Sequence, residues 1–131
     1  MERQKHCVYN QTRECFLSLG VLVTDISLLR LKTLISSSML NLDEGIWVVP
    51  PNGIRSRGGL FPLDLVYLDR ECQVVDAVEA LSAIRPTPGK VRAASVLALP
   101  AHSIYSSQTL PGDRLLIGVV EEMEVRLAAC G

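Results

Sequence analysis

A carboxylate stands inside the most apolar stretch of the sequence, FPLDLVYLD at residues 61–69. Seven of these nine residues are apolar or proline, and a short apolar run of this kind is typical of a strand that is buried on both faces. Asp64 interrupts the run and shares a strand face with Val66 and Leu68. Because a buried carboxylate without partners is very costly, Asp64 must accept hydrogen bonds or meet a cation.

The nearest supply of partners in the sequence is the loop before this strand, NGIRSRGG at residues 52–59. Gly58 and Gly59 bring backbone N–H groups, and Arg55 and Arg57 bring guanidinium groups. We therefore interpret the acid first as a structural latch that ties this loop to the strand, and only secondarily as a site residue.

The rest of the chain carries mostly β patterns and one clear helical pattern. A helix of about three turns follows an N-cap at Thr24 or Asp25, with Leu28, Leu31 and Ile35 on one face. A shorter helical or turn segment is expected at 101–108, and loops at 52–59 and 85–90. Strands are predicted at 6–9, 14–23, 46–50, 61–69, 73–81, 93–100, 114–120 and 123–128.

These patterns predict a single β-rich α+β domain over residues 1–131. We expect a small barrel or a strongly curved, mostly antiparallel sheet, plugged by the one main helix. In the last predicted strand, Met123, Val125 and Leu127 alternate with charged residues. This strand should therefore pack one face on the sheet, or alternatively serve as the edge of a homodimer.

Composition narrows the partners and the compartment. The formal net charge is −1 with a pI near 6.1, so the chain lacks the basic footprint of non-specific nucleic-acid binding, and no nucleic-acid partner is expected. No apolar run approaches the roughly 20 residues that span a bilayer, and no signal peptide is recognised. Cys7, Cys15, Cys72 and Cys130 lack zinc-site spacing. We expect a cytoplasmic protein with reduced thiols, no metal and no cofactor.

Four segments over about residues 14–118 resemble, in order, the bacterial and archaeal family called domain of unknown function 192. Pro62-Leu63-Asp64, followed by an apolar pair and Leu-Asp, is similar to the family's most specific motif. Asp43-Glu44-Gly45, the strand at Val74-Val75, and VLALPA with the later Pro-Gly-Asp turn are similar to the three other segments. The resemblance implies a compact β-rich domain with one or two short helices, and it implies no activity.

The chain departs from the family pattern at several positions. Ile54, Ser56 and Gly58 stand where the family usually carries Phe-x-Met and an Asn, so a ligand site built from those residues would be altered or lost here. Cys72 stands at a turn glycine, a position that commonly needs a positive φ. His102 replaces the glycine that follows Leu-Pro-Ala in the family.

The loop at residues 52–59 is also the best candidate for ligand binding. Its glycines could present N–H groups to an anion and its two arginines add charge, which gives a candidate site of Asp64, Arg55, Arg57, Gly58 and Gly59. A second basic segment, with Arg85, Lys90 and Arg92, could converge on this loop. The spacing matches neither a P-loop nor a dinucleotide fingerprint, and the alternative is that these arginines are simply solvated.

Enzymatic interpretations are weaker. The acids of the hairpin that starts at Asp64 do not form a pair, because parity puts Asp69 on the opposite face. A nucleophile at Cys72 or at one of Ser36, Ser37 and Ser38, with His102 as base, lacks any surrounding signature.

Two hypotheses from different classes remain. We favour a non-enzymatic binding, interaction or accessory domain that recognises an anionic small molecule or a partner protein. The alternative is a hydrolase-like enzyme whose site lies where Asp64, Arg55 and Arg57 meet.

Overall fold

The computed structural model describes residues 5–36, 44–56, 61–80, 90–119, 121, 123 and 124. Its strands are β1 (His6–Asn10), β2 (Cys15–Thr24), β3 (Ile46–Val48), β4 (Ile54–Ser56), β5 (Asp64–Leu68), β6 (Val74–Val78), β7 (Lys90–Ala93), β8 (Ser95–Leu99) and β9 (Leu115–Gly118). Its helices are α1 (Leu28–Ser36) and α2 (Ser103–Ser107). The predicted β-rich α+β class is confirmed.

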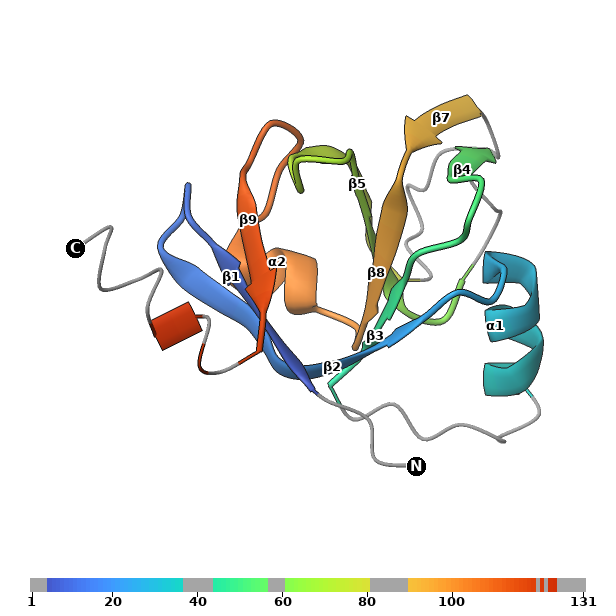
Figure 1. The fold of residues 1–131 in the computed structure, drawn as a ribbon, viewed down its shortest axis with the longest axis horizontal. Helices are drawn as coiled ribbons and strands as arrows, with labels where there is room; N and C mark the ends of the chain where they lie inside the picture. The colour runs from blue at the N-terminus through green and yellow to red at the C-terminus, as the bar shows by residue number, and fades with distance from the viewer. Residues whose placement is uncertain are drawn as a thin grey trace.

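Seven strands form one strongly curled sheet in the order β6-β5-β8-β3-β2-β1-β9, which gives a half-barrel (Figure 1). Neighbouring strands in this sheet are antiparallel except β2 and β3. A parallel pair needs a crossover, and α1 supplies it between these two strands. The remaining strands, β4 and β7, form a separate antiparallel ribbon. The predicted strongly curved, mostly antiparallel sheet is therefore confirmed.

The sheet is buried on both faces at its centre, where every residue of β5 and β8 is buried. We call the cluster on its concave side the inner core, which consists of Val8, Val21, Val66, Leu68, Val74, Leu97, Leu99, Ile104 and Leu115. The cluster on the other side is the outer core, which consists of Leu31, Ile46, Val48, Ile54, Phe61, Leu65, Tyr67, Val78, Ala93, Val96 and Ala98. The odd and even residues of β5 divide between the two cores, as strand parity requires.

The helix inside the curl is the short α2 and not the main helix, so the prediction that the main helix plugs the sheet is wrong. In Figure 1, α2 lies inside the curl and α1 lies outside it. Accordingly, Ile104 of α2 belongs to the inner core and Leu31 of α1 belongs to the outer core. The reason is topological, because a helix that connects two parallel strands must lie on one face of their sheet. With nine and five residues, α1 and α2 are also too short to cross a membrane, and no other helix among the described residues could do so.

The two edge strands of the curled sheet come together at one end. Backbone hydrogen bonds join the start of β6 to the turn before β9, from Val74 N–H to the Asp113 carbonyl (2.8 Å), from Gly112 N–H to the Val74 carbonyl (2.7 Å) and from Leu115 N–H to the Cys72 carbonyl (2.9 Å). These bonds satisfy edge groups that would otherwise be left unpaired, and they hold the half-barrel in its curled shape.

One strand lies where a loop was predicted, and another begins at the last residue of a predicted loop. β4 falls inside the predicted loop 52–59, and β7 begins at Lys90, the last residue of the predicted loop 85–90. The rest of that second loop lies outside the described residues. Each strand is too short to give a recognisable sequence pattern, and each forms because Ile54 and Ala93 can both be buried in the outer core.

The predicted strand at 123–128 is wrong for the residues that the structure describes. Glu121, Met123 and Glu124 are helical, and the Met123 N–H donates to the Val119 carbonyl at 3.0 Å, which is the i to i−4 bond of a helical turn. The spacing from Val119 to Met123 is helical as well as alternating, and Met123 is buried. A homodimer edge on this strand is therefore not supported, and residues 125–128 lie outside the described part.

Candidate functional site

Asp64 lies at the start of β5 and is completely buried. Its Oδ1 accepts the backbone N–H of Ala80 at 2.7 Å, and its Oδ2 accepts the backbone N–H of Ile104 at 2.8 Å. The N-cap residue of α2, His102, makes no side-chain capping hydrogen bond. The Asp64 carboxylate instead accepts the Ile104 N–H, one of the groups that the first turn of a helix leaves without a partner. The carboxylate thus joins three segments of the chain beside the inner core.

The predicted role of Asp64 as a hydrogen-bond acceptor is confirmed, but the partners that the structure gives differ from those predicted. They belong to the segment after β6 and to α2, and not to the loop at residues 52–59. Arg57, Gly58 and Gly59 lie outside the described residues, so their part in a ligand site stays a prediction. Arg55 is described and lies exposed on β4.

The two predicted basic segments do meet, since β4 and β7 pair with each other. Ile54 faces Ala93 and Ser56 faces Lys90 across this ribbon, with an irregularity between the two pairs. Ile54 and Ala93 are buried in the outer core, whereas Arg55, Lys90 and Arg92 are exposed. The ribbon therefore has an apolar face on the core and three cationic side chains on its solvent side; Figure 1 shows it projecting beyond β3 and β8. We call these three side chains the cationic face.

The cationic face has no carboxylate partner among the described residues. Within the parts of the chain that the structure describes, the ion pair is that of Arg13 and Asp113, with 3.0 Å between Nε and Oδ2. Three neighbouring cations without an acid between them give a local positive potential on a protein whose formal net charge is −1. The arrangement suits an anionic partner.

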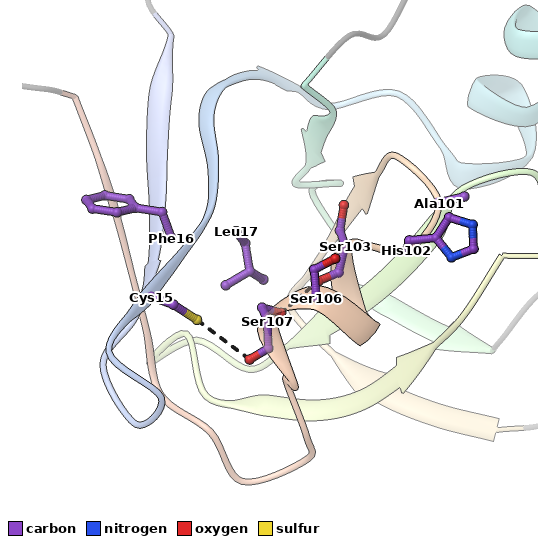
Figure 2. A pocket seen from close by; sticks show the side chains of 8 residues that line it. All are labelled: Cys15, Phe16, Leu17, Ala101, His102, Ser103, Ser106 and Ser107. Carbon is purple, nitrogen blue, oxygen red and sulfur yellow. Dashed lines mark hydrogen bonds between the residues drawn. The ribbon is translucent and has the colours of Figure 1, made fainter.

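A surface cavity of about 230 Å³ lies between the start of β2 and α2, and sequence analysis did not predict it (Figure 2). It is lined by Cys15, Phe16, Leu17, Ala101, His102, Ser103, Ser106 and Ser107. The Cys15 thiol donates to the Ser107 carbonyl at 3.6 Å, and Figure 2 shows His102 at the opposite end of the cavity. The cavity is smaller than the roughly 300–1,000 Å³ of most ligand sites, and no base stands beside the Cys15 thiol among the residues that line it.

A buried polar network lies next to this cavity and ties the β1–β2 hairpin to the turn before β9. The Asn10 side-chain amide donates to Thr109 Oγ1 at 3.2 Å and to Asp113 Oδ2 at 3.0 Å. Burial raises the pKa of Asp113, but hydrogen bonds from Arg13, Asn10 and the Leu110 N–H, together with the Arg13 charge, outweigh it and lower the pKa below its ordinary value. Asp113 is therefore a structural anion whose partners are already in place.

The predicted nucleophile and base are not brought together among the described residues. Cys72 lies in the β5–β6 turn beside the inner core, and His102 lies exposed at the start of α2. Ser37 and Ser38 lie outside the described part. The described residues therefore give no support to that catalytic arrangement.

No family model matches the chain, and no curated protein matches it. Solved structures do resemble it. A proposed transcription regulator from Sinorhizobium meliloti 1021 superposes with a TM-score of 0.62 at 17% identity, over 88% of this chain and 93% of that one. A protein of unknown function from Novosphingobium aromaticivorans DSM 12444 superposes with a TM-score of 0.60 at 16% identity, over 86% of this chain and 83% of that one. At these identities the likeness is one of fold.

Proposed function

We propose that this protein is a non-enzymatic binding module and that its cationic face docks on the acidic surface of a partner protein. One observation carries the proposal, namely that the pairing of β4 with β7 gathers Arg55, Lys90 and Arg92 on one exposed surface. Exposed cations of this kind attract and orient an acidic partner, and their effect weakens as salt screens it.

A partner protein fits this surface better than an anionic small molecule. A small anion is held tightly where donors converge around it in a concave, largely desolvated site. The cationic face instead consists of exposed side chains on two neighbouring strands. Such a surface needs several carboxylates spread over a matching area.

The alternative hydrolase-like function has less support. A catalytic carboxylate must be free to take or give a proton in contact with substrate. Both oxygens of Asp64 already accept backbone N–H groups, and the side chain is completely buried. Arg55 was predicted to lie in the same site as Asp64, but its side chain is exposed on β4.

The family and the compartment are part of this proposal. We infer a divergent member of the family domain of unknown function 192, which three matched residues support. Gly45 has a φ of +103°, Asp64 is buried, and Asp113 follows Gly112, which has a φ of +97°. The free thiols of Cys7, Cys15 and Cys72 support a cytoplasmic location.

The proposal is tested with fluorescently labelled poly-L-glutamate as a generic acidic polypeptide. We expect binding at low salt that weakens at physiological salt, and a loss of affinity of at least about tenfold in the triple variant Arg55→Glu/Lys90→Glu/Arg92→Glu. The matched control is Arg30→Glu/Arg70→Glu/Arg114→Glu, which makes the same charge change at exposed positions on α1, in the β5–β6 turn and before β9. It should retain most of the affinity.

Two results would refute the proposal. Equal losses in the two triple variants would mean that only net charge matters. Tighter binding of a DNA duplex than of poly-L-glutamate would make the partner a nucleic acid.

A further inference from the structure

We infer that the cationic face recognises an extended acidic segment whose carboxylates stand at alternate residues. This inference rests on the proposed function and adds to it the conformation and the sequence spacing of the partner. It follows from the way in which β7 distributes its side chains between the core and the solvent.

Burial alternates strictly along β7. Lys90 and Arg92 are exposed, Val91 is half-buried against the outer core, and Ala93 is buried in it. The pairing of β7 with β4 is irregular between Lys90 and Ala93, yet Lys90 and Arg92 are both exposed, and side chains two residues apart on an extended strand stand at most about 6.6 Å apart along its axis. An extended segment with an acid at every second residue repeats at the same interval, so that successive carboxylates can meet successive cations.

The third cation broadens the surface to two strands. Arg55 lies between Ile54 and Ser56, which pair with Ala93 and Lys90 of β7. Cross-strand neighbours stand about 5 Å apart, so an extended segment that follows β7 also passes within reach of Arg55. In the described part of the chain, β4 and β7 pair only with each other and form a two-stranded ribbon.

The ribbon is held in place before any partner arrives. Ile54 and Ala93 belong to the outer core, and the φ of Gly53 at the base of the ribbon is +71°. A Cβ at Gly53 would lie 2.9 Å from the Ala93 carbonyl oxygen, so the two backbones approach as closely as only glycine allows. The cations therefore project from a fixed frame, and binding requires little ordering of the backbone.

The experiment compares three labelled peptides of equal length and equal net charge, measured by fluorescence anisotropy at low salt. In the first, glutamate alternates with threonine, which favours an extended chain. In the second, the same residues form one glutamate block and one threonine block. The third contains glutamate and alanine in equal numbers, with the glutamates in adjacent pairs, and both residues favour a helix.

We expect the alternating peptide to bind about fivefold to tenfold more tightly than the other two, and this preference to disappear in Arg55→Glu/Arg92→Glu. The preference should survive in Arg70→Glu/Arg114→Glu. Equal affinity for all three peptides overturns the inference, and so does tighter binding of the block or the helical peptide. If that happens while poly-L-glutamate still distinguishes the two triple variants, the proposed function stands and only the extended, alternating partner is lost.

Discussion

At the scale of single residues, the central question is what the buried carboxylate of Asp64 does. Its two oxygens accept hydrogen bonds from the backbone N–H groups of Ala80, after β6, and Ile104, in the first turn of α2. A buried donor that loses its acceptor costs its full desolvation free energy. Asp64 is therefore a structural acid, and its removal should be felt in the free energy of unfolding.

We predict that Asp64→Ala lowers the free energy of unfolding by about 2–4 kcal/mol, because it leaves one buried and one partly buried donor unpaired. Asp64→Asn should lose about half as much, since its single carbonyl oxygen can still accept one of the two N–H groups. Urea denaturation followed by circular dichroism measures both losses.

The matched control for this prediction is Asp69→Ala. Asp69 also accepts two backbone N–H groups, from Glu71 and Gln73 at 2.9 Å each, but it lies half-buried in the β5–β6 turn. Water can replace its carboxylate there, so we expect a smaller loss, of about 1 kcal/mol. If Asp64→Ala is no less stable than Asp69→Ala, the structural role assigned to Asp64 is wrong.

Several of these residue-scale features could be predicted from the sequence. The burial of Asp64, its strand face and its need for acceptor bonds all follow from the apolar run around it. The positive φ expected at Cys72 is confirmed at +61°. The partners of Asp64 could not be predicted, because they lie 16 and 40 residues away and become neighbours only when the sheet curls.

At the scale of elements, the sequence pattern succeeds where an element is long or uniformly apolar. The β1–β2 pair, α1, β5 and β6 were all predicted close to their observed bounds. The ribbon of β4 and β7 was missed because each strand has only three or four residues, and its stability comes from the outer core. The helical turn at Met123 was missed because the alternation of Met123, Val125 and Leu127 predicted a strand. The spacing from Val119 to Met123 fits a helix equally well.

Two glycines test how closely neighbouring elements approach. Gly45, just before β3, and Gly112, in the turn before β9, both have φ near +100°, which is strained for any other residue. A Cβ at Gly45 would lie 2.6 Å from the Ala98 carbonyl oxygen, whereas one at Gly112 would meet nothing within 4 Å. The two positions share the backbone strain and differ in the steric contact.

We predict that Gly112→Ala lowers the free energy of unfolding by about 1–2 kcal/mol, which is the cost of backbone strain alone. Gly45→Ala should lose at least about 2 kcal/mol more, because β3 must move away from β8 to admit the methyl group. Thermal and urea unfolding of the two variants give the difference. Equal losses would show that β3 does not approach β8 closely enough for a methyl group at Gly45 to clash with it.

At the scale of the whole molecule, the half-barrel is held together where its ends meet. Backbone bonds join β6 to the turn before β9, and the network around Asp113 joins that turn to the β1–β2 hairpin. The curled shape could be predicted from the many short strands. The hydrogen bonds that fix this shape could not be predicted. The bond between Arg13 and Asp113, for example, joins residues that are 100 positions apart, and no sequence pattern pairs them.

This network makes a prediction about stability and pH. Folding lowers the pKa of Asp113, so the ionised group adds stability above the pKa of the unfolded chain, about 3.9, and this stability is lost as the pH falls through the folded value. Asp113→Asn should therefore be less stable than wild type at pH 7, by about 1–3 kcal/mol for its lost charged hydrogen bonds. The difference between wild type and variant should then shrink as the pH falls below about 4, because the wild-type group becomes neutral as well.

The measurement is urea unfolding of wild type and Asp113→Asn between about pH 7 and about pH 3, with Asp25→Asn as the control at an exposed aspartate. The control should follow wild type over the whole range, since a solvated carboxylate is lost at little cost. A difference between wild type and Asp113→Asn that stays constant down to the lowest pH would mean that the amide and the carboxylate differ only in packing. In that case the charge of Asp113, paired with Arg13, would not be what holds the β1–β2 hairpin against the closing turn of the half-barrel.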